Sequence, residues 1–310
     1  MPKLTRKRLL LAKIEATYGT DPTPTGAANA ILVRNLEITP LQSDIVQREL
    51  IRPYLGNYEQ LLAQTRVQVT FEVELAGSGT AGTAPAYGPV LRACGLSQAI
   101  GATTVTYVPL SSNFASVSLY FFQDGIRHRV TGARGSFTLN GSVGAIPTIA
   151  FEMTGIYNAP TTPTAVVPTY GSQATPLIFK NDNTTSFSAF GYAAALQSID
   201  LNMSNEIIYR ELVGGTKEVL ITDRKPSGTL QIESPALATK DYFTTSTGNT
   251  LGSITFQHGT AAGNRATLTM AQADLADASY TDMDGITMLN LPYVATPTAA
   301  GNDELSLVFT

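Results

Sequence analysis

The 310-residue sequence contains no tryptophan, a single cysteine and only two histidines. Cys94 alone cannot form a disulfide within the chain, and the apolar residues around it predict a buried, unreactive thiol. His128 and His258 are few for an enzyme of this length, and no cysteine–histidine cluster has metal-ligand spacing. The glycine-rich segment 76–85 lacks the Gly-Lys-Ser/Thr ending of a phosphate-binding loop and is predicted to be a flexible connection. We therefore expect a non-enzymatic protein with no catalytic residues, no cofactor and no metal.

Charge is scarce as well, at 14% of the residues compared with about a quarter in a typical soluble protein. Such a composition is typical of a β-rich chain, and of a subunit that neighbours cover. The chain lacks a run of eighteen apolar residues, so no transmembrane helix is expected. The apolar run Leu9–Ala12 is too short for the core of a signal peptide, so export is not expected.

The charges that do occur are distributed unevenly. The first thirteen residues hold five basic side chains and no acidic one, namely Lys3, Arg6, Lys7, Arg8 and Lys13. Without them, 20 − 5 = 15 basic residues face 24 acidic ones, a net charge of −9 for the rest of the chain. The basic start is therefore interpreted either as a solvated tail or as an arm that docks on an acidic neighbour.

Alternation of apolar and polar residues predicts a mostly β fold. In residues 67–75 the apolar side chains fall on odd positions and the polar ones on even positions, which places one face of a strand on a core. Asp124-Gly125 between two such runs is a strong hairpin signal. The strands predicted in the first half are Ile31–Thr39, Thr65–Leu75, Ser116–Gln123, Gly135–Asn140 and Pro147–Gly155.

Two short helices and one long linker complete this prediction. One helix is expected from Pro89 to Cys94 and a second over Ala236–Phe243. Residues 158–176 contain four prolines, which stiffen a segment and interrupt sheet ladders, so this stretch is predicted to connect two domains.

A block of ten residues recurs across this linker. Residues 41–50 read LQSDIVQREL, and residues 203–212 read MSNEIIYREL. The identical positions are Ile45 and Ile207, Arg48 and Arg210, Glu49 and Glu211, and Leu50 and Leu212. In each half a strand precedes the block, and a second strand, a short helix and further strands follow it, ending in Ile149–Thr154 and Leu305–Thr310. Because the order of elements agrees, duplication of one domain is the better explanation.

The predicted organisation is an N-terminal arm (1–30), a first β domain (31–157), a proline- and threonine-rich linker (158–189) and a second β domain (190–310). Each domain is expected to be a β-sandwich or partial barrel with one short helix. Arg48–Glu49 and Arg210–Glu211 are the only charged pair found in both halves. They are interpreted either as ordinary pairs at a strand edge or as contacts between subunits, and the second interpretation is preferred because duplication kept them.

Three stretches of the first half resemble the tail-tube proteins of long-tailed bacteriophages. They read AKIEATYGTDPTPTGAANAILVRNLEITPLQSDIVQRELIRPYLG, TFEVELAGSGTAGTAPAYGPVLRACG and RHRVTGARGSFTLNGSVGAIPTIAFEMTG. The resemblance covers residues 9–156, and reaches 190–310 only through the repeat. It implies a β-sandwich subunit with a flanking helix and a long hairpin or loop, in stacked rings of six domains. With the domain doubled, three chains complete a ring, although the strong divergence of the second half puts the likeness of its contacts in doubt.

The resemblance also implies where the protein works and with what. It would polymerise with itself in the virion tail after synthesis in the host cytoplasm, around a tape-measure protein and later double-stranded DNA, and meet tail-terminator and distal-tail proteins. It implies no membrane partner. The candidate contacts between subunits are Arg48, Glu49, Arg210, Glu211, Lys3, Arg6, Lys7 and Arg8.

A ring of six domains is wide enough for DNA. The resemblance implies that each domain lends about four strands to a continuous inner barrel, and about 24 strands spaced ~4.8 Å apart and tilted ~40° give a backbone radius of ~24 Å. Side chains leave a bore of about 35–40 Å, through which a duplex ~20 Å wide passes. Because each Lys or Arg at a phosphate adds affinity, we expect a net acidic bore that does not hold DNA. A small acidic cluster is interpreted as a solvated loop or part of that bore, since its spacing does not match a calcium loop; it comprises Asp274, Asp277, Asp282 and Asp284.

Three other functions remain open. An extracellular adhesion or carbohydrate-binding β-sandwich would need exposed aromatic residues on one face, and the absence of tryptophan weakens it. A β-sandwich hydrolase would need an acid–base constellation that the sequence does not show. Another ring protein of the tail, at the tube end or the baseplate, would share the same sequence features.

Overall fold

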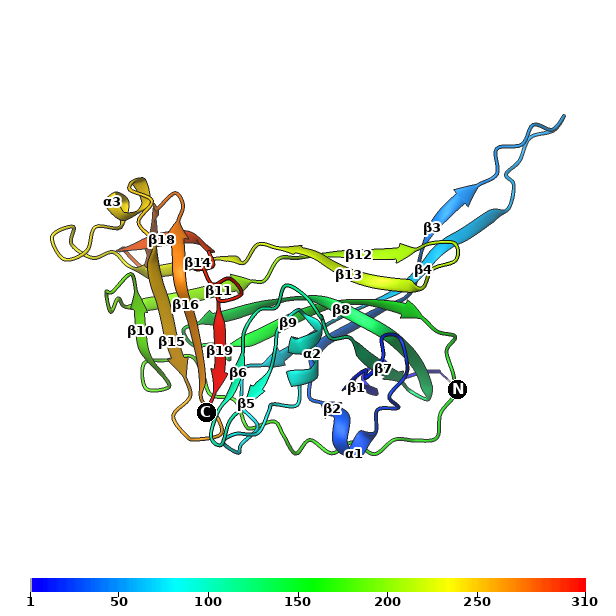
Figure 1. The fold of residues 1–310 in the computed structure, drawn as a ribbon, viewed down its shortest axis with the longest axis horizontal. Coiled ribbons are helices and arrows are strands. Elements are labelled where there is room, and N and C mark those ends of the chain that lie inside the picture. The colour runs from blue at the N-terminus through cyan, green and yellow to red at the C-terminus, as the bar shows by residue number, and fades with distance from the viewer. Residues whose placement is uncertain (1) are drawn as a thin grey trace.

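The computed structural model describes residues 2–310 and is mostly β (Figure 1). The first half contains β1 (Arg8–Ile14), α1 (Gly26–Asn29), β2 (Ala30–Ile31), β3 (Arg34–Gln47), β4 (Gln60–Glu74), α2 (Gly88–Ala93), β5 (Ala99–Ile100), β6 (Val105–Tyr107), β7 (Val117–Gln123), β8 (Ile126–Ser142) and β9 (Thr148–Tyr157). The second half contains β10 (Thr184–Ala189), β11 (Leu196–Asn202), β12 (Asn205–Glu211), β13 (Lys217–Arg224), β14 (Ser227–Glu233), α3 (Tyr242–Thr247), β15 (Gly252–His258), β16 (Ala266–Leu275), β17 (Ser279–Met283), β18 (Ile286–Ala295) and β19 (Ser306–Phe309). None of the helices among these residues has the length and apolar character needed to cross a membrane.

Strands follow the same spatial order in the two halves. In the first half the order is β1-β7-β8-β9-β4-β3, and in the second it is β10-β15-β16-β18-β14-β11. Each half places its helix α2 or α3 at the same point of the chain, after β4 or β14. The second half adds β17 beside β18 and β19 beside β16.

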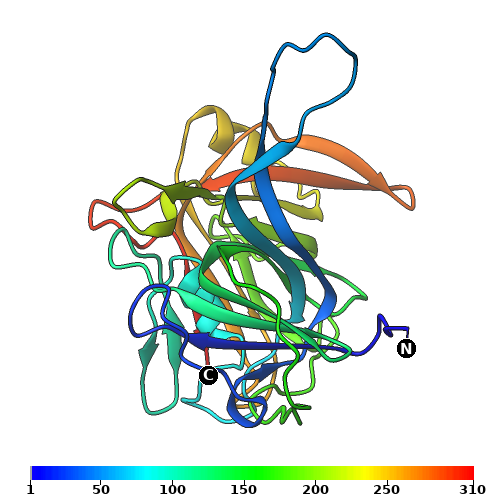
Figure 2. The ribbon, with the colours of Figure 1, turned by 90° about the vertical axis from the view of Figure 1, so that its right-hand side faces the viewer.

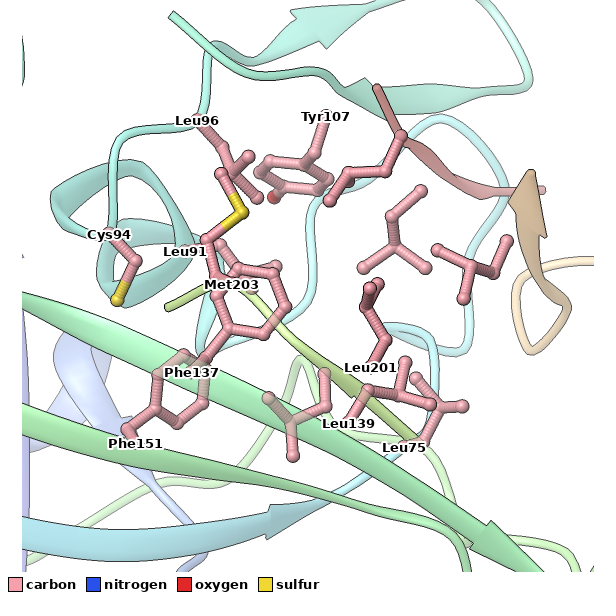
Figure 3. Packing of buried hydrophobic residues seen from close by; sticks show 14 of the residues in the cluster. Leu75, Leu91, Cys94, Leu96, Tyr107, Phe137, Leu139, Phe151, Leu201 and Met203 are labelled. Atoms are coloured by element: carbon pink, nitrogen blue, oxygen red, sulfur yellow. The ribbon is translucent and has the colours of Figure 1, made fainter. Parts of the chain in front are cut away.

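Backbone hydrogen bonds join the two halves into one sheet. β8 pairs with β11, and β6 pairs with β19, both antiparallel. All strands except β12 and β13 belong to this sheet, and β12 and β13 pair with each other. The hydrophobic core is shared in the same way, because one cluster contains residues of both halves. Figure 3 shows Leu91, Phe137 and Phe151 of the first half packed with Leu201 and Met203 of the second.

The core explains the alternation seen in the sequence. Val67, Val69, Phe71 and Val73 of β4 are buried in the hydrophobic core, as the pattern predicted. Cys94 is buried at the end of α2, so the prediction of a buried thiol is confirmed, and burial raises the pKa of this thiol.

Glu15 is a buried carboxylate that holds the start of the chain on the sheet. Its two oxygens accept hydrogen bonds from the Ser116 and Ser118 hydroxyls, each at 2.6 Å, and from the amides of Gly19 and Gly132, each at 2.7 Å. Four donors meet one carboxylate, and this explains how the acidic group is accommodated inside the protein without a basic partner.

Most predicted elements of the first half are confirmed. The five predicted strands correspond to β2 with β3, β4, β7, β8 and β9, and the predicted helix corresponds to α2. Asp124 and Gly125 connect β7 and β8 with φ angles of 41° and 86°, so the hairpin signal is also confirmed. The structure adds α1, a four-residue helix that the sequence did not predict.

Other predictions need correction. The second helix begins at Tyr242 rather than Ala236, because the Asp241 carboxylate caps it by accepting hydrogen bonds from the amide and hydroxyl of Thr244, at 3.0 and 2.6 Å. The last strand, β19, is not the counterpart of β9, because β18 lies beside β14 as β9 lies beside β4.

Two of the predicted segments, the N-terminal arm and the linker, contain β-strands. Residues 8–14, assigned to the N-terminal arm, form β1, whose Leu10, Leu11 and Ala12 are buried in the core. The arm is therefore shorter than predicted. The predicted linker 158–189 ends in β10, which pairs with β15.

Replacing Glu15 by glutamine should destabilise the folded chain. The amide keeps one acceptor oxygen, and its NH2 group can donate to a serine hydroxyl but not to a glycine amide, so one buried N–H loses its acceptor at a cost of about 1–3 kcal/mol. Chemical denaturation of Glu15→Gln against wild type measures this cost. The same change at exposed Glu37 is the control, and equal midpoints for both variants would contradict the role given to Glu15.

Candidate assembly surface

The hairpin of β3 and β4 extends far beyond the rest of the molecule (Figures 1 and 2). The strands remain paired as far as Gln47 and Gln60, and residues 48–59 connect them. The connection has internal contacts of its own: the Arg52 guanidinium lies 4.6 and 4.3 Å from the ring centres of Tyr54 and Tyr58.

Apolar side chains cover this hairpin although it has no core of its own. Ile51 and Leu55 at its tip are fully exposed, and the residues along its strands are about half exposed. The exposed apolar side chains are Leu41, Ile45, Val46, Leu50, Ile51, Tyr54, Leu55, Leu61 and Leu62. An apolar surface this extensive is characteristic of a site that another protein covers.

The second hairpin, β12–β13, lies against the body instead (Figure 1). Its Val219 is buried: the amide donates a hydrogen bond to the Tyr18 hydroxyl at 2.6 Å, and the carbonyl accepts one from Arg134 at 2.8 Å. At its base, the Asn205 side-chain amide donates to the carbonyls of Cys94 and Gly135, at 2.7 and 2.9 Å. The second hairpin therefore shows how such a hairpin packs when its partner surface is present.

The repeated blocks lie in these two hairpins, and each repeated arginine forms an ion pair with a glutamate on the opposite side of its own hairpin. Arg48 pairs with Glu59, and Arg210 pairs with Glu218 at 3.0 Å. A hydrogen bond from the Thr216 hydroxyl, and then the charge of Arg210, lower the pKa of Glu218. The two repeated pairs occupy matching places in the two hairpins.

The second acid of each pair has a different environment. Glu211 pairs with Lys217 at 3.0 Å and accepts a hydrogen bond from the Tyr209 hydroxyl at 3.2 Å. Burial, and then the charge of Glu211, raise the pKa of Tyr209 to about 12. Glu49 is exposed near the tip of the long hairpin.

The basic residues at the start of the chain mostly bind the chain itself. Lys3 donates to the Asp124 carbonyl at 2.6 Å, Lys7 lies 3.6 Å from the Asp124 carboxylate, and Arg8 donates to the Leu36 carbonyl. The Leu4 amide, followed by the charges of Lys7 and Lys3, lowers the pKa of Asp124. Arg6 is exposed.

One face of the large sheet is polar and acid-rich. On β4, β9, β8, β11 and β14 the side chains that alternate with the core residues are mostly Thr, Ser, Asn, Gln and acids. The acids on this face are Glu37, Glu72, Glu74, Glu152, Asp200 and Glu233. Of the basic side chains there, Arg34 pairs with Glu72 at 3.3 Å, Arg66 pairs with Asp44 at 3.3 Å, and Arg134 binds backbone carbonyls. Partial burial raises the pKa of Asp200.

The other chemical candidates do not form sites. Within residues 2–310, no group of three or more His, Cys, Asp or Glu side chains could hold a metal ion, and this includes the acidic cluster 274–284. His258 is buried: its Nε2 donates to the Leu177 carbonyl, and its Nδ1 accepts from the Thr184 hydroxyl. His128 is a half-buried strand residue of β8.

The resemblance implied a long hairpin or loop, but sequence reasoning missed its position at β3–β4 and its apolar surface. It placed the repeated block between two strands and gave no role to Leu61 and Leu62 or to the tip residues Ile51 and Leu55. Five leucine and isoleucine residues within 50–62 that match no core periodicity were the available signal.

Replacing Leu55 by aspartate should weaken self-association and leave the fold intact, because the exposed side chain is not part of the core of one chain. Losing one buried leucine per contact costs about 1.5–3 kcal/mol, which corresponds to an increase of about 10- to 100-fold in the concentration needed for assembly. Light scattering against protein concentration measures the change. Leu55→Met, which keeps the apolar surface, is the control, and equal thresholds for both variants would contradict this role.

Charge reversal at Arg48 tests the repeated pair. Arg48→Glu should reduce assembly while changing the stability of the monomer by less than about 1 kcal/mol, since the pair with Glu59 is exposed. The double variant Arg48→Glu with Glu59→Arg restores the pair within the hairpin. If assembly stays low in the double variant, Arg48 contacts a neighbour; recovery would show that the pair only holds the hairpin, and the candidate contact would then be rejected.

One family model, described as phage tail tube protein, matches residues 5–307. None of the curated proteins compared with the chain matches it. The family match includes both hairpins, the whole polar face and the exposed apolar surface described above. Because it covers nearly the whole chain, the protein belongs to the phage tail tube protein family, whose members are non-enzymatic structural proteins of the virion tail.

Proposed function

We propose that three copies of this chain form a ring of six similar domains, that the rings stack into a hollow tube, and that the polar face of the sheet lines the bore through which DNA passes. The observation that carries this proposal is the single sheet that runs through both halves with a core on one face and an open, acid-rich surface on the other. Self-polymerisation itself is general for tail tube proteins.

A duplicated domain is supported by the matching order of strands. Six strands and one helix follow each other identically in the two halves, and the ion pairs Arg48–Glu59 and Arg210–Glu218 occupy equivalent places. The shared core and the β8–β11 ladder mean that the two halves of one chain fold as one body. The domain boundaries 31–157 and 190–310 remain a prediction, with β1 and β10 lying outside them.

Stacking is supported by the long hairpin. Its apolar surface needs a partner, and a further copy of the same chain offers one on every subunit of a tube. A contact between two different surfaces of identical subunits continues without limit unless a rotation closes it, and this generates filaments. The basic residues near the N-terminus, including Arg6, and the pairs at Arg48 and Arg210 remain candidate contacts between subunits.

Passage of DNA is supported by the charge of the polar face. Carboxylates repel phosphates, and the arginines on this face are engaged by carboxylates or carbonyls, so DNA finds few cations to bind. A tape-measure protein would occupy the same bore before DNA, and tail-terminator and distal-tail proteins would cover the two ends of the tube.

Negative-stain microscopy of the purified chain, alone or with phage lysate, tests the assembly. Hollow tubes built of three-chain rings are expected. Inert monomers would contradict the proposal, and single rings that never stack would favour a tube-end or baseplate ring.

Charge reversal on the polar face tests the bore. Glu152→Lys with Glu233→Lys should leave tube shape unchanged but slow DNA ejection from phage carrying the variant, with the greatest delay at low salt, because each new ammonium group binds phosphate. Glu152→Gln with Glu233→Gln removes the charges without adding cations and is the control. Unchanged ejection rates in the lysine variant would remove these residues from the bore.

A further inference from the structure

Two strand edges of the chain are unpaired at opposite ends of the large sheet. Among residues 2–310, β3 pairs only with β4, and β17 pairs only with β18. Four of the five residues of β17 are exposed, and Tyr280 has 59% of its surface accessible. An exposed edge that contains an aromatic residue is a template for pairing with another strand.

Within one chain, two strands that are equivalent to these edges already pair with each other. Where the two halves meet, β8 and β11 pair antiparallel, with Thr138 opposite Asn202, Leu139 opposite Leu201 and Asn140 opposite Asp200. The ladder therefore joins the last residues of β8 in the first half to β11 in the second half. A ring of repeated domains needs the same junction between chains as within them.

The two unpaired strands are the counterparts of β8 and β11. β3 ends the strand order of the first half as β11 ends that of the second: Ile38 lies opposite Val69 of β4, and Leu201 lies opposite Gly228 of β14. The sequences agree, with Leu-Glu-Ile-Thr at 36–39 and Ile-Asp-Leu-Asn at 199–202.

β17 corresponds in the same way to the end of β8. Ser279 lies opposite Asn290 of β18, and Thr138 lies opposite Ala150 of β9. The equivalence of β18 and β9 follows from their pairing with β14 and β4, where Leu291 faces Leu230 and Phe151 faces Phe71.

From this equivalence we infer that β17 of one copy pairs antiparallel with β3 of a second copy, with Thr39 opposite Ser279, Ile38 opposite Tyr280 and Glu37 opposite Thr281. The inference rests on the proposed ring and names the strands that close it. The partner is a second copy of this chain, because each copy presents β3, the equivalent of the strand β11 that pairs with β8 within one chain.

The side chains suit this register. Ile38 and Tyr280 form a β-branched and aromatic cross-strand pair, and Glu37 meets a hydroxyl. A slip of one residue places Glu37 opposite Asp282, which sets two carboxylates against each other, and turns the apolar side chains of one strand to the wrong face. The register is therefore specified by charge and by burial.

The number of strands in the inferred barrel agrees with the number from which the width of the bore was estimated. Pairing runs without interruption through β3, β4, β9, β8, β11, β14, β18 and β17, which is eight strands in one chain. Three chains joined by β17–β3 pairs give 3 × 8 = 24 strands and a closed barrel of radius ~24 Å. The closed barrel has no unpaired edge in this part of the sheet.

A cysteine pair tests the register. In Thr39→Cys with Ser279→Cys, both new thiols are exposed and lie at opposite edges of one chain, and residues directly opposite each other in an antiparallel pair have the Cα spacing that a disulfide needs. Cys94 is buried and does not interfere. Mild oxidation of assembled tubes should give covalent dimers and trimers on a denaturing, non-reducing gel, with the ladder ending at three.

The matched control is Thr39→Cys with Asp282→Cys, which uses the same two strands but places the second thiol three residues away on the other face. It should cross-link at least tenfold less. Normal tubes without cross-links in the first variant, equal cross-linking in the control, or a ladder beyond three would overturn the inferred junction and leave tube formation standing. Absence of tubes from the wild-type chain would instead overturn the proposed function, and the junction with it.

Discussion

Five antiparallel residue pairs, Thr138–Ser142 of β8 against Ser198–Asn202 of β11, turn two similar halves into one sheet. Without this ladder each half would end in a free strand edge, and the core that lies beneath it would be divided. Met203 and Leu201 reach the residues around α2 only because β11 is held beside β8. The rest of the structure follows from this junction: a continuous polar face, two unpaired outer edges, and a second hairpin that lies over the first half.

The two hairpins show what a missing neighbour does to a surface. β12–β13 rests on the body of its own chain and buries Val219, whereas β3–β4 presents nine apolar side chains to solvent. Water-exposed apolar area on this scale is unfavourable for a lone subunit and becomes a driving force once a second subunit covers it. In the proposed tube, β3–β4 would reach a neighbouring chain as β12–β13 reaches the first half of its own.

In the proposed tube, assembly and the passage of DNA would depend on different surfaces of the chain. Hydrogen-bonded ladders and apolar contacts would join the subunits of this tube, and such contacts are little affected by salt. The face proposed to line the bore would need the opposite property, which is weak and repulsive contact with phosphates. Placing core residues and polar residues on alternate positions of the same strands lets one sheet serve both purposes, because the pleat separates the two faces.

The sequence by itself determined the mostly β fold, the helix α2, the Asp124-Gly125 turn, the buried cysteine and the repeated block, because each depends on the spacing of neighbouring residues. Only the tertiary structure decided that Arg48 and Arg210 bind glutamates of their own hairpins, that β1 belongs to the core, and that β18 rather than β19 matches β9. It also decided which apolar residues lack a partner. Burial and strand pairing join positions a hundred or more residues apart, and local periodicity carries no information about such distant contacts.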